Sequence, residues 1–436
     1  MGLLVRYPTA RFGRYAAAAG AFIFFLVWAF RIRIEQVGPS LHVQVTPWMP
    51  TSSADDIFDF PPIESETIKA ACSTTEWDTK SAMQVVFTCD HSVGGIGNIR
   101  NSILNCVRYA ILAGGSLVMP RIVVRNDSDI TVIRTDEVYK ALGPPRTWSL
   151  GLFPESLVEE ERIPGTGIEH PERWRGQLYD WLNNIDTDTA PTGKPSEGPF
   201  VVDLGRSYLT YPIYSDGESF ATSFGDILKF RADTRELATA TLVRMAQKFE
   251  FMIPRPADGI SPPSPILEHA FFGAHLRAEK DSQDNWNPID PMWEWSEYSK
   301  QTAAYLEQAT LSNLSLIYVA SGNVTQVGTF ASEAKPKGIT VITKQDMLAE
   351  DSSERDRLED LAWDQQALVD FLIMLRASQF GGVAHSSFAW NIALKRHLFV
   401  KSSGSHLDGP QMLSDELSQI YGEPRKYPEY ASCLWP

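Results

Sequence analysis

The sequence predicts an α/β protein made of two units, each with a parallel sheet. Short apolar runs rich in β-branched residues alternate with helical segments in both halves of the chain, which is typical of parallel sheets. The chain of 436 residues exceeds what one hydrophobic core usually serves, and a Pro-rich break spans 257–265. We therefore place an N-terminal unit at 81–258, a C-terminal unit at 266–420 and a tail at 421–436.

The composition limits the partners of the protein. With 43% hydrophobic and 11% aromatic residues the chain is globular, and its formal net charge is -15. This charge argues against nucleic acid or an anionic membrane surface as the main partner. An anionic ligand must therefore be met by a local cluster of cations.

The N-terminus has the pattern of a membrane anchor. Residues 16–30 read "AAAAGAFIFFLVWAF", without charge, and arginines stand on both sides. As a helix this run covers roughly 22 Å. We predict a cytoplasmic tail at 1–15, a signal anchor at 16–34 and a Pro- and Ser-rich stem at 35–80. A single-pass type II protein with a lumenal body, in the Golgi or the endoplasmic reticulum, follows from this arrangement.

A cleaved signal peptide is the alternative for the same segment. The residues after the apolar run, "AFRIRIE", offer no small-residue cleavage site, so we favour the anchor. N-glycosylation triplets agree with a lumenal body. They begin at Asn126, Asn313 and Asn323. Four cysteines without CxxC spacing indicate structural disulfides or small buried residues. They are Cys72, Cys89, Cys106 and Cys433.

Regular structure begins in the N-terminal half with a strand, a glycine turn and a helix. "MQVVFTCD" at 83–90 predicts a strand, and "GGIGN" at 94–98 predicts a tight turn. The apolar stripe of the next segment predicts a helix, with Gly114 and Gly115 as its C-terminal stop. A second strand is expected at 116–124.

The C-terminal half continues the alternation of strands and helices. Strands are expected at 271–277, 315–321, 338–344, 379–384 and 398–402. Helices are expected around 297–311, over 357–377 and from 386 onwards. In such sheets, ligands bind at the carboxyl ends of the strands, where loops and helix N-termini meet.

The glycine turn is the first candidate site. Gly94, Gly95 and Gly97 would let backbone amides approach a ligand, and the following helix would offer its N-terminal N–H groups to an anion. The turn lacks the full spacing of the known phosphate loops. A turn that only packs is therefore the alternative.

The strand at 271–277 ends on a second candidate site. His275 and Arg277 share one face of that strand where it leaves the sheet. A guanidinium at this edge suits bidentate contact with phosphate. The alternative is an ordinary surface pair between Arg277 and either Glu279 or Asp281.

The third candidate site lies near the C-terminal end. Asp370 stands on an apolar helix, where a solvated position would cost a carboxylate less. Ser386 and Ser387 follow a Gly-Gly strand and begin a helix, so they are candidate N-caps beside amides that suit a phosphate. Simple capping is the alternative for the serines.

Together, these segments resemble the GDP-fucose O-fucosyltransferase-like superfamily, which includes the protein O-fucosyltransferases and related plant proteins. The resemblance rests on four motifs in the family's order, over roughly residues 83–400. They are "GGIGNIRNSI", "HLRAEKD", "IYVASGN" and "ALVDFLIMLRASQFGGVAHSSFAWNIA".

The resemblance implies a GT-B fold, in which two Rossmann-like domains face each other across a cleft. The N-terminal unit would lie on the acceptor side, and the C-terminal unit would bind the sugar nucleotide. The implied reaction is metal-free transfer of fucose from GDP-fucose to a protein or glycan. Arg277 would stabilise the departing diphosphate. Asn98 would face the donor sugar and the acceptor, and Asp370 would contact guanine. The implied nucleotide-binding set is His275, Asp370, Ser386, Ser387, Phe388, Gly95 and Gly97.

Several points stay open at this stage. Ala278 stands where some relatives have a second arginine, and Glu279, Asp281 and Asp284 are the nearby candidates for a base. The "HLRAEKD" wording also occurs in relatives that transfer rhamnose from UDP-rhamnose. A catalytically inactive, anchored binding module is a further alternative.

A metal-dependent glycosyltransferase of the other common fold would need an Asp-x-Asp pair that binds a divalent ion. Asp127 with Asp129, and Asp186 with Asp188, fit the letters of that pattern. The second pair lies in a polar insertion, and the first follows an arginine-rich strand end. We therefore favour the metal-free prediction.

Overall fold

All the residues that are described belong to one unit of the chain, residues 49–436. The structure is a computed structural model. It describes residues 57–58, 64–77, 85–88, 95–118, 146–149, 162–163, 167–168, 200–203, 211, 216–254, 265–280, 282, 291–400, 414–423 and 435–436. The predicted anchor at 16–34 lies outside these ranges. Within them, no helix is long and apolar enough to cross a membrane.

The C-terminal half forms a five-stranded sheet with the order β11-β10-β7-β8-β9. Every neighbouring pair in it is parallel. Its strands are β7 (Phe272–His275), β8 (Leu316–Ala320), β9 (Thr340–Ile342), β10 (Gln379–Val383) and β11 (Ser418–Tyr421). The first four confirm predicted strands.

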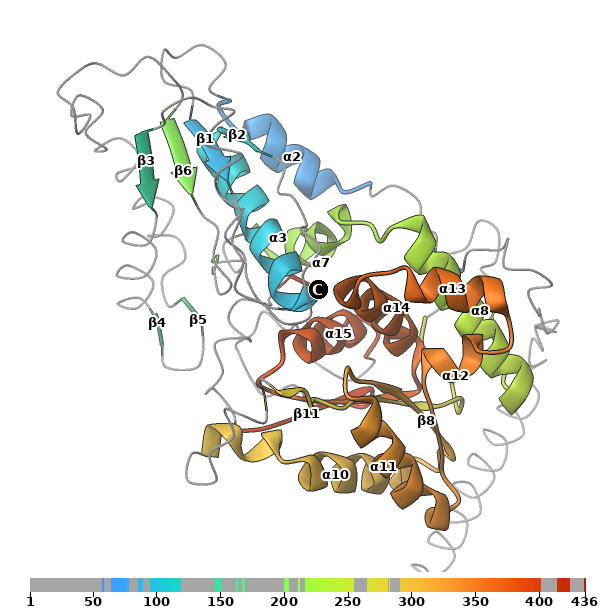
Figure 1. Ribbon diagram of the computed structural model, residues 1–436. Helices are drawn as coiled ribbons and strands as arrows, with labels where there is room; N and C mark the ends of the chain where they lie inside the picture. The colour runs from blue at the N-terminus through green and yellow to red at the C-terminus, as the bar shows by residue number, and fades with distance from the viewer. Residues whose placement is uncertain are drawn as a thin grey trace, which may run out of the picture. The chain divides into compact units, whose positions relative to one another are not determined.

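Helices cover both faces of this sheet, as Figure 1 shows for α14 and α15 on one side and α10 and α11 on the other. The first face carries α8 (Ala232–Phe249), α14 (Trp363–Arg376) and α15 (Ser387–His397). The second face carries α10 (Tyr298–Leu311) and α11 (Val324–Ala334). Short helices complete the half: η4 (Pro291–Ser296), η5 (Lys335–Lys337), α12 (Lys344–Leu348) and α13 (Ser352–Glu359).

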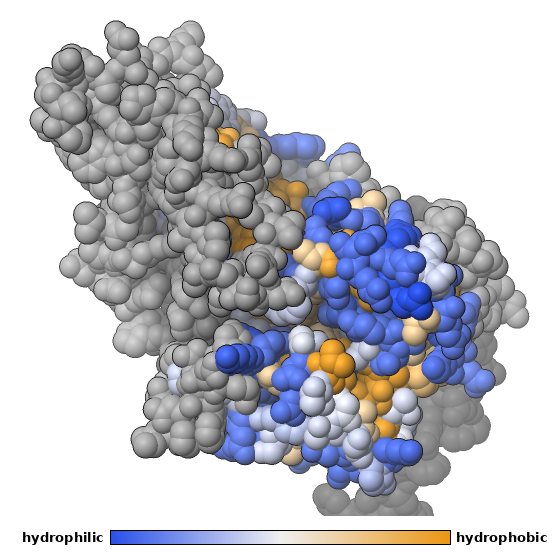
Figure 2. All heavy atoms as spheres, in the orientation of Figure 1, coloured by the Kyte–Doolittle hydropathy of each residue, from blue (hydrophilic) through white to orange (hydrophobic). Residues whose placement is uncertain are grey.

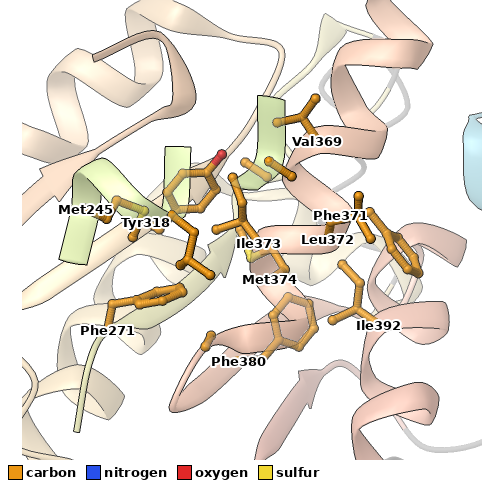
Figure 3. Packing of buried hydrophobic residues seen from close by; sticks show 14 of the residues in the cluster. Met245, Phe271, Tyr318, Val369, Phe371, Leu372, Ile373, Met374, Phe380 and Ile392 are labelled. Atoms are coloured by element: carbon orange, nitrogen blue, oxygen red, sulfur yellow. The ribbon is translucent and has the colours of Figure 1, made fainter. Parts of the chain in front are cut away.

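The alternation of side chains along the strands creates two hydrophobic clusters. Phe271 and Tyr318 pack with α8 and α14, whereas Phe272 and Ile317 belong to the cluster under α10 and α11. In Figure 3, Tyr318 and Phe271 lie on one side of the α14 side chains, with further apolar residues beyond. The sheet is therefore buried on both faces, as a parallel sheet requires.

The N-terminal half contains a separate four-stranded sheet with the order β2-β1-β6-β3, again parallel throughout. Its strands are β1 (Val85–Thr88), β2 (Ser116–Leu117), β3 (Arg146–Ser149) and β6 (Phe200–Asp203). A two-stranded antiparallel pair joins β4 (Arg162–Ile163) and β5 (Gly167–Ile168). The described helices of this half include α2 (Glu66–Thr74), α3 (Ile96–Ala113), α7 (Glu218–Phe224) and η3 (Gly225–Ile227).

Helix α3 follows the glycine turn as predicted. It ends at Gly114, whose φ of 65° places it in the left-handed region, and the Gly114 N–H bonds back to the carbonyls of Ala110 and Ile111. Of the predicted apolar stripe, Ile103, Cys106 and Ala110 are buried, whereas Ile99, Val107 and Ile111 are only partly buried. Polar residues such as Asn101 and Arg108 are buried as well.

Two expectations about individual elements were wrong, and one strand was not predicted. The predicted helix 357–377 is two helices, because the chain breaks before Ala362, whose N–H is capped by the Gln365 side chain at the start of α14. The part of 398–402 that is described is a turn after α15 rather than a strand. The fifth strand is instead β11, which the sequence did not single out.

The predicted stem is partly folded. It contains α2, and Ser65 at the start of that helix contacts Ser223 of α7 at 2.9 Å. Phe58 is 2% exposed and lies in the cluster under α14. Residues 57–77 therefore include folded structure, whereas 35–56 lie outside the described ranges.

Little of the predicted break between the two units is described, whereas part of the predicted C-terminal tail packs on the folded body. Of 257–265, only residue 265 is described, so the position of the boundary stays a prediction. Helix α8, which precedes that break, packs on α14 of the second sheet. In the tail, Trp435 is fully buried, and its indole N–H donates to Asn105 of α3 at 2.6 Å.

Cys106 is disulfide-bonded and Cys72 is free, while Cys89 and Cys433 lie outside the described residues. Of the glycosylation triplets, Asn126 lies outside these ranges and Asn313 is exposed after α10. Where Figure 2 is coloured, the face shown is mainly hydrophilic with smaller apolar areas between. Trp363 and Val324 are among the large apolar residues that are exposed.

Candidate active site

The order of the strands locates the candidate site. From β7 the chain proceeds outward through β8 to β9, and it then crosses to β10 on the other side of β7. This reversal makes the carboxyl ends of β7 and β10 a topological switch point, which is where open α/β sheets bind ligands. His275 ends β7, and Ser386 follows β10.

His275 contacts the beginning of α15. Its Nδ1 lies 3.4 Å from Ser386 Oγ, and its ring centre lies 4.8 Å from that of Phe388. The imidazole is 8% exposed. Burial lowers the pKa of His275 to about 4, with Glu279 opposing this effect and Arg277 adding to it. The histidine is therefore neutral at pH 7 and beside the predicted nucleotide set.

Arg277 lies two residues beyond His275 and is fixed through both its backbone and its side chain. Gln301 accepts from the Arg277 N–H at 2.9 Å and donates to the Arg277 carbonyl at 3.0 Å. Its guanidinium Nη1 is 2.6 Å from Glu279 Oε2. The ion pair between Arg277 and Glu279, given above as the alternative to phosphate contact, is therefore present. Its side chains are only 22% and 17% exposed, so it is not an ordinary surface pair. Asp281 and Asp284 lie outside the described residues.

Ser386 is the N-cap of α15, as the sequence predicts. Its Oγ accepts from the Ala389 N–H at 3.4 Å, and Ser387 is the first helical residue. Ser386 and Ser387 are 6% and 7% exposed. The N-terminus of α15, with its positive end of the helix dipole, thus lies at the end of β7.

The glycine turn of the N-terminal half meets the same helix. A Cβ atom placed on Gly97 would lie 2.7 Å from Ser387 Oγ and from the backbone nitrogen of Phe388. Gly95 caps α3 without a side-chain hydrogen bond and has open space where a Cβ would be. The first turns of α3 and α15 are therefore in direct contact. Gly94 lies outside the described residues.

A second contact joins the two helices one turn further on. Arg100 of α3 donates to Asn391 Oδ1 of α15 at 2.7 Å. Its guanidinium also donates to the carbonyl of Trp435 at 2.9 Å. Two helix N-termini are thus held side by side, and backbone N–H groups at such ends suit an anion.

Asn98 lies in the first turn of α3, and its side chain is an unsatisfied acceptor. It is 8% exposed, and none of the described residues donates a hydrogen bond to its Oδ1. An amide oxygen buried without a donor costs free energy on the order of 1–3 kcal/mol. A ligand hydroxyl that donates to Asn98 would recover that cost.

Asp370 has partners within the protein. Its Oδ1 accepts from the Tyr318 hydroxyl at 2.6 Å, and its Oδ2 pairs with Lys344 Nζ at 2.6 Å. Burial raises the pKa of Asp370, and Lys344 opposes this effect. Asp370 is 4% exposed, and its neighbour Phe371 packs against Phe388. Its implied contact with guanine stays a prediction.

Among the residues described, no group of three or more His, Cys, Asp or Glu side chains is placed to hold a metal ion. The two Asp-x-Asp pairs at 127–129 and 186–188 lie outside those residues. Metal independence therefore stays a prediction.

No family model and no curated protein matches this chain. Among solved structures, POFUT1 in complex with GDP is 15% identical, with a TM-score of 0.41, over 79% of this chain and 100% of that chain. The fucosyltransferase NodZ from Bradyrhizobium is 13% identical, with a TM-score of 0.35, over 72% and 92%. The neighbours are fucosyltransferases.

A third similar structure is a mutant of Arabidopsis thaliana FUT1 in complex with GDP. It is 13% identical, with a TM-score of 0.30, over 77% of this chain and 73% of that chain. At these values the comparisons assign no role to any residue of this chain. The roles of the site residues rest instead on their contacts within this chain.

Some residues that shape the site carry no sequence signal. Gln301 holds the backbone of Arg277 from α10, and the Tyr305 hydroxyl donates to the His275 carbonyl at 2.8 Å. Both lie inside an ordinary helical pattern. Asn323, in contrast, belongs to the motif "IYVASGN", and it caps α11 by accepting from the Gln326 N–H at 3.1 Å.

The arrangement can bind an anion and stabilise charge that develops on it. A guanidinium and two helix N-termini lie around one edge of the second sheet, next to a neutral imidazole. A low-dielectric setting of this kind favours fixed donors that act on a leaving group. The geometry is therefore suited to a phosphorylated ligand.

Proposed function

We propose that this protein is a glycosyltransferase that moves fucose from GDP-fucose to a hydroxyl of a protein or glycan without a metal ion. The observation that carries the proposal is the contact between Gly97 of α3 and Ser387 of α15. It joins the glycine turn of the first sheet to the serine cap that follows His275 and Arg277 of the second. Because of these contacts, the glycine turn, the "HLRAEKD" motif and the serine cap lie close to one another.

Within this proposal, each residue has a stated role. Arg277 stabilises the diphosphate as the glycosidic bond breaks, and the N-termini of α3 and α15 bind its oxygens. Asn98, with its unsatisfied Oδ1, accepts from a hydroxyl of the donor sugar or the acceptor. His275 and Phe388 line the nucleotide.

The proposal includes the architecture and the location of the protein. The two parallel sheets act as the two halves of a GT-B enzyme, with the first half on the acceptor side. The anchor at 16–34 holds the enzyme in the Golgi or endoplasmic reticulum membrane with the catalytic part in the lumen. The proposal assigns no residue as the base that would take the proton from the acceptor hydroxyl.

Transfer of rhamnose from UDP-rhamnose is the second candidate function. The hydrogen bonding of Asp370 is the observation in its favour. Both oxygens of Asp370 already accept hydrogen bonds, from Tyr318 and Lys344. A carboxylate that reads the N–H edge of guanine needs at least one oxygen directed to the base. The choice between guanine and uracil therefore needs its own measurement.

Calorimetric titration of the full chain with GDP, GDP-fucose and UDP, both without and with a chelator, tests the proposal. We expect GDP and GDP-fucose to bind and UDP to bind much more weakly. Preferential binding of UDP would select the second candidate. Binding that disappears with the chelator would contradict metal independence, and no binding of any nucleotide would contradict both candidates.

A further inference from the structure

Glu279 lies between Arg277 and the loop after β8. One carboxylate oxygen, Oε2, is 2.6 Å from Arg277 Nη1, and the other, Oε1, accepts from the Gly322 N–H at 2.8 Å. The carboxylate therefore connects the segment after β7 to the segment after β8. Charge-assisted bonds of this kind are the stronger and better-oriented hydrogen bonds.

Asn323, which follows Gly322, also holds the segment after β7 in place. Its Nδ2 donates to the Ala278 carbonyl at 2.9 Å, while its Oδ1 accepts from the Gln326 N–H and caps α11. Gln301 of α10 holds the backbone of Arg277 on the other side. The three residues 277–279 are therefore tied to two helices and one loop.

Trp363 and Glu279 both approach the backbone of Gly322 closely. A Cβ at Gly322 would lie 2.9 Å from Trp363 Nε1 and 3.3 Å from Glu279 Cγ. A side chain at this position would thus push the indole or the carboxylate away. With glycine there, the Gly322 N–H reaches the Glu279 carboxylate, whose ion pair with Arg277 has side chains only 22% and 17% exposed.

The environment of Glu279 makes it a poor proton acceptor. Burial raises the pKa of Glu279, but Arg277, His275 and the Gly322 N–H together lower it more, so the pKa lies below its ordinary value. A general base works best with a pKa near the working pH. The base candidacy of Glu279 is therefore not supported by its contacts.

We propose that Glu279, supported by Gly322 and Asn323, is a positioning residue that orients the Arg277 guanidinium toward the diphosphate of a sugar nucleotide. This inference rests on the proposed function for the role of Arg277. It explains why Gly322 and Asn323 of the "IYVASGN" motif, and the negative charge of Glu279, lie beside Arg277. Glu279 acts through Arg277 and does not touch the ligand.

The test is a double-mutant cycle on GDP affinity, measured by calorimetry with the full chain. Glu279→Ala should weaken GDP binding about tenfold in the wild-type background. The same change in the Arg277→Ala background should have no further effect, because its target is gone. Glu279→Gln keeps one acceptor oxygen but loses the charge, and it should recover about half of the loss on a logarithmic scale.

Asp233→Ala is the matched control, because Asp233 pairs with Arg231 at 2.6 Å over the same two-residue spacing on the exposed start of α8. It should leave GDP affinity unchanged, and unfolding curves of all variants should confirm that they are folded. If Arg277→Ala weakens GDP binding while Glu279→Ala does not, or if the two losses add, the inference is wrong and the proposed function stands. If the wild type binds neither GDP nor UDP, the proposed function fails and this inference fails with it.

Discussion

Gly97 at the start of α3 lies against Ser387 at the start of α15, with no room for a methyl group between them. This contact brings together two segments that are 290 positions apart in the sequence, as 387 minus 97 gives. Glycine is therefore needed at 97 for close approach rather than for an unusual backbone angle. The neighbouring Gly95 has open space instead.

The first prediction compares these two glycines. Gly97→Ala should destabilise the protein by about 1–3 kcal/mol, since overpacking forces backbone shifts. Gly95→Ala should change the free energy of unfolding by less than about 0.5 kcal/mol. Urea unfolding of both variants measures this difference. Equal effects would show that the two helix N-termini are not in contact.

The second prediction concerns the buried pair of Asp370 and Lys344. Asp370→Ala leaves the Lys344 ammonium buried without its partner and should cost about 3–5 kcal/mol of unfolding free energy. Replacing both residues with apolar ones of similar size should cost much less. Chemical denaturation of the single and double variants measures both values.

The milder Asp370→Asn variant separates stability from recognition of the base. If Asp370 contacts guanine as the sequence resemblance implies, the preference for GDP over UDP should fall in this variant. Calorimetry with the two nucleotides at a temperature where the variant is folded gives the ratio. An unchanged ratio would remove Asp370 from base recognition and leave it a structural role.

The third prediction concerns pH. The pKa of His275 is about 4 in the folded protein and close to its ordinary value of 6.5 when unfolded. Between these values the unfolded chain binds a proton that the folded chain does not, so stability falls as the pH falls from 6.5 to 4. The loss from this residue alone should reach about 3 kcal/mol.

Unfolding measurements at pH 7 and at pH 4.5 on the wild type and on His275→Gln isolate this contribution from that of the acidic residues. The variant should lose less stability than the wild type over this range. An identical loss in both proteins would mean that His275 is protonated in the folded state.

The fourth prediction concerns the C-terminal segment. Trp435 is fully buried beside Phe224, with ring centres 4.7 Å apart. Trp435→Ala should therefore cost about 3–5 kcal/mol. Trp77→Ala is the matched control, because Trp77 is 44% exposed, and it should cost far less. A small effect at Trp435 would contradict the docking of this segment on α3 and α7.

Much of the second half was predictable because its strands are short apolar runs bounded by turn residues. The N-cap role of Ser386 was predictable too, since a serine between a Gly-Gly strand and a helix is a known signal. Strand β11 was not, because it is an edge strand with alternating burial and little apolar character. The break before α14 depends on a local cap that the apolar pattern conceals.

The partners of the site residues were the hardest to predict. Lys344 and Tyr318 are 26 and 52 positions from Asp370, and no spacing rule connects them. Gln301 is similarly remote from Arg277, at 24 positions. Such pairs follow from the order of the strands in the sheet, which a single sequence does not specify.

Turnover of Arg277→Ala tests the central claim most directly. Release of GDP from GDP-fucose is measured in the wild type, in this variant and in the control Arg231→Ala, whose side chain is 62% exposed. We predict a loss of about 100-fold or more in the Arg277 variant, with unfolding unchanged, because a donor aimed at the departing diphosphate is removed. Near-normal turnover in that variant would contradict the account.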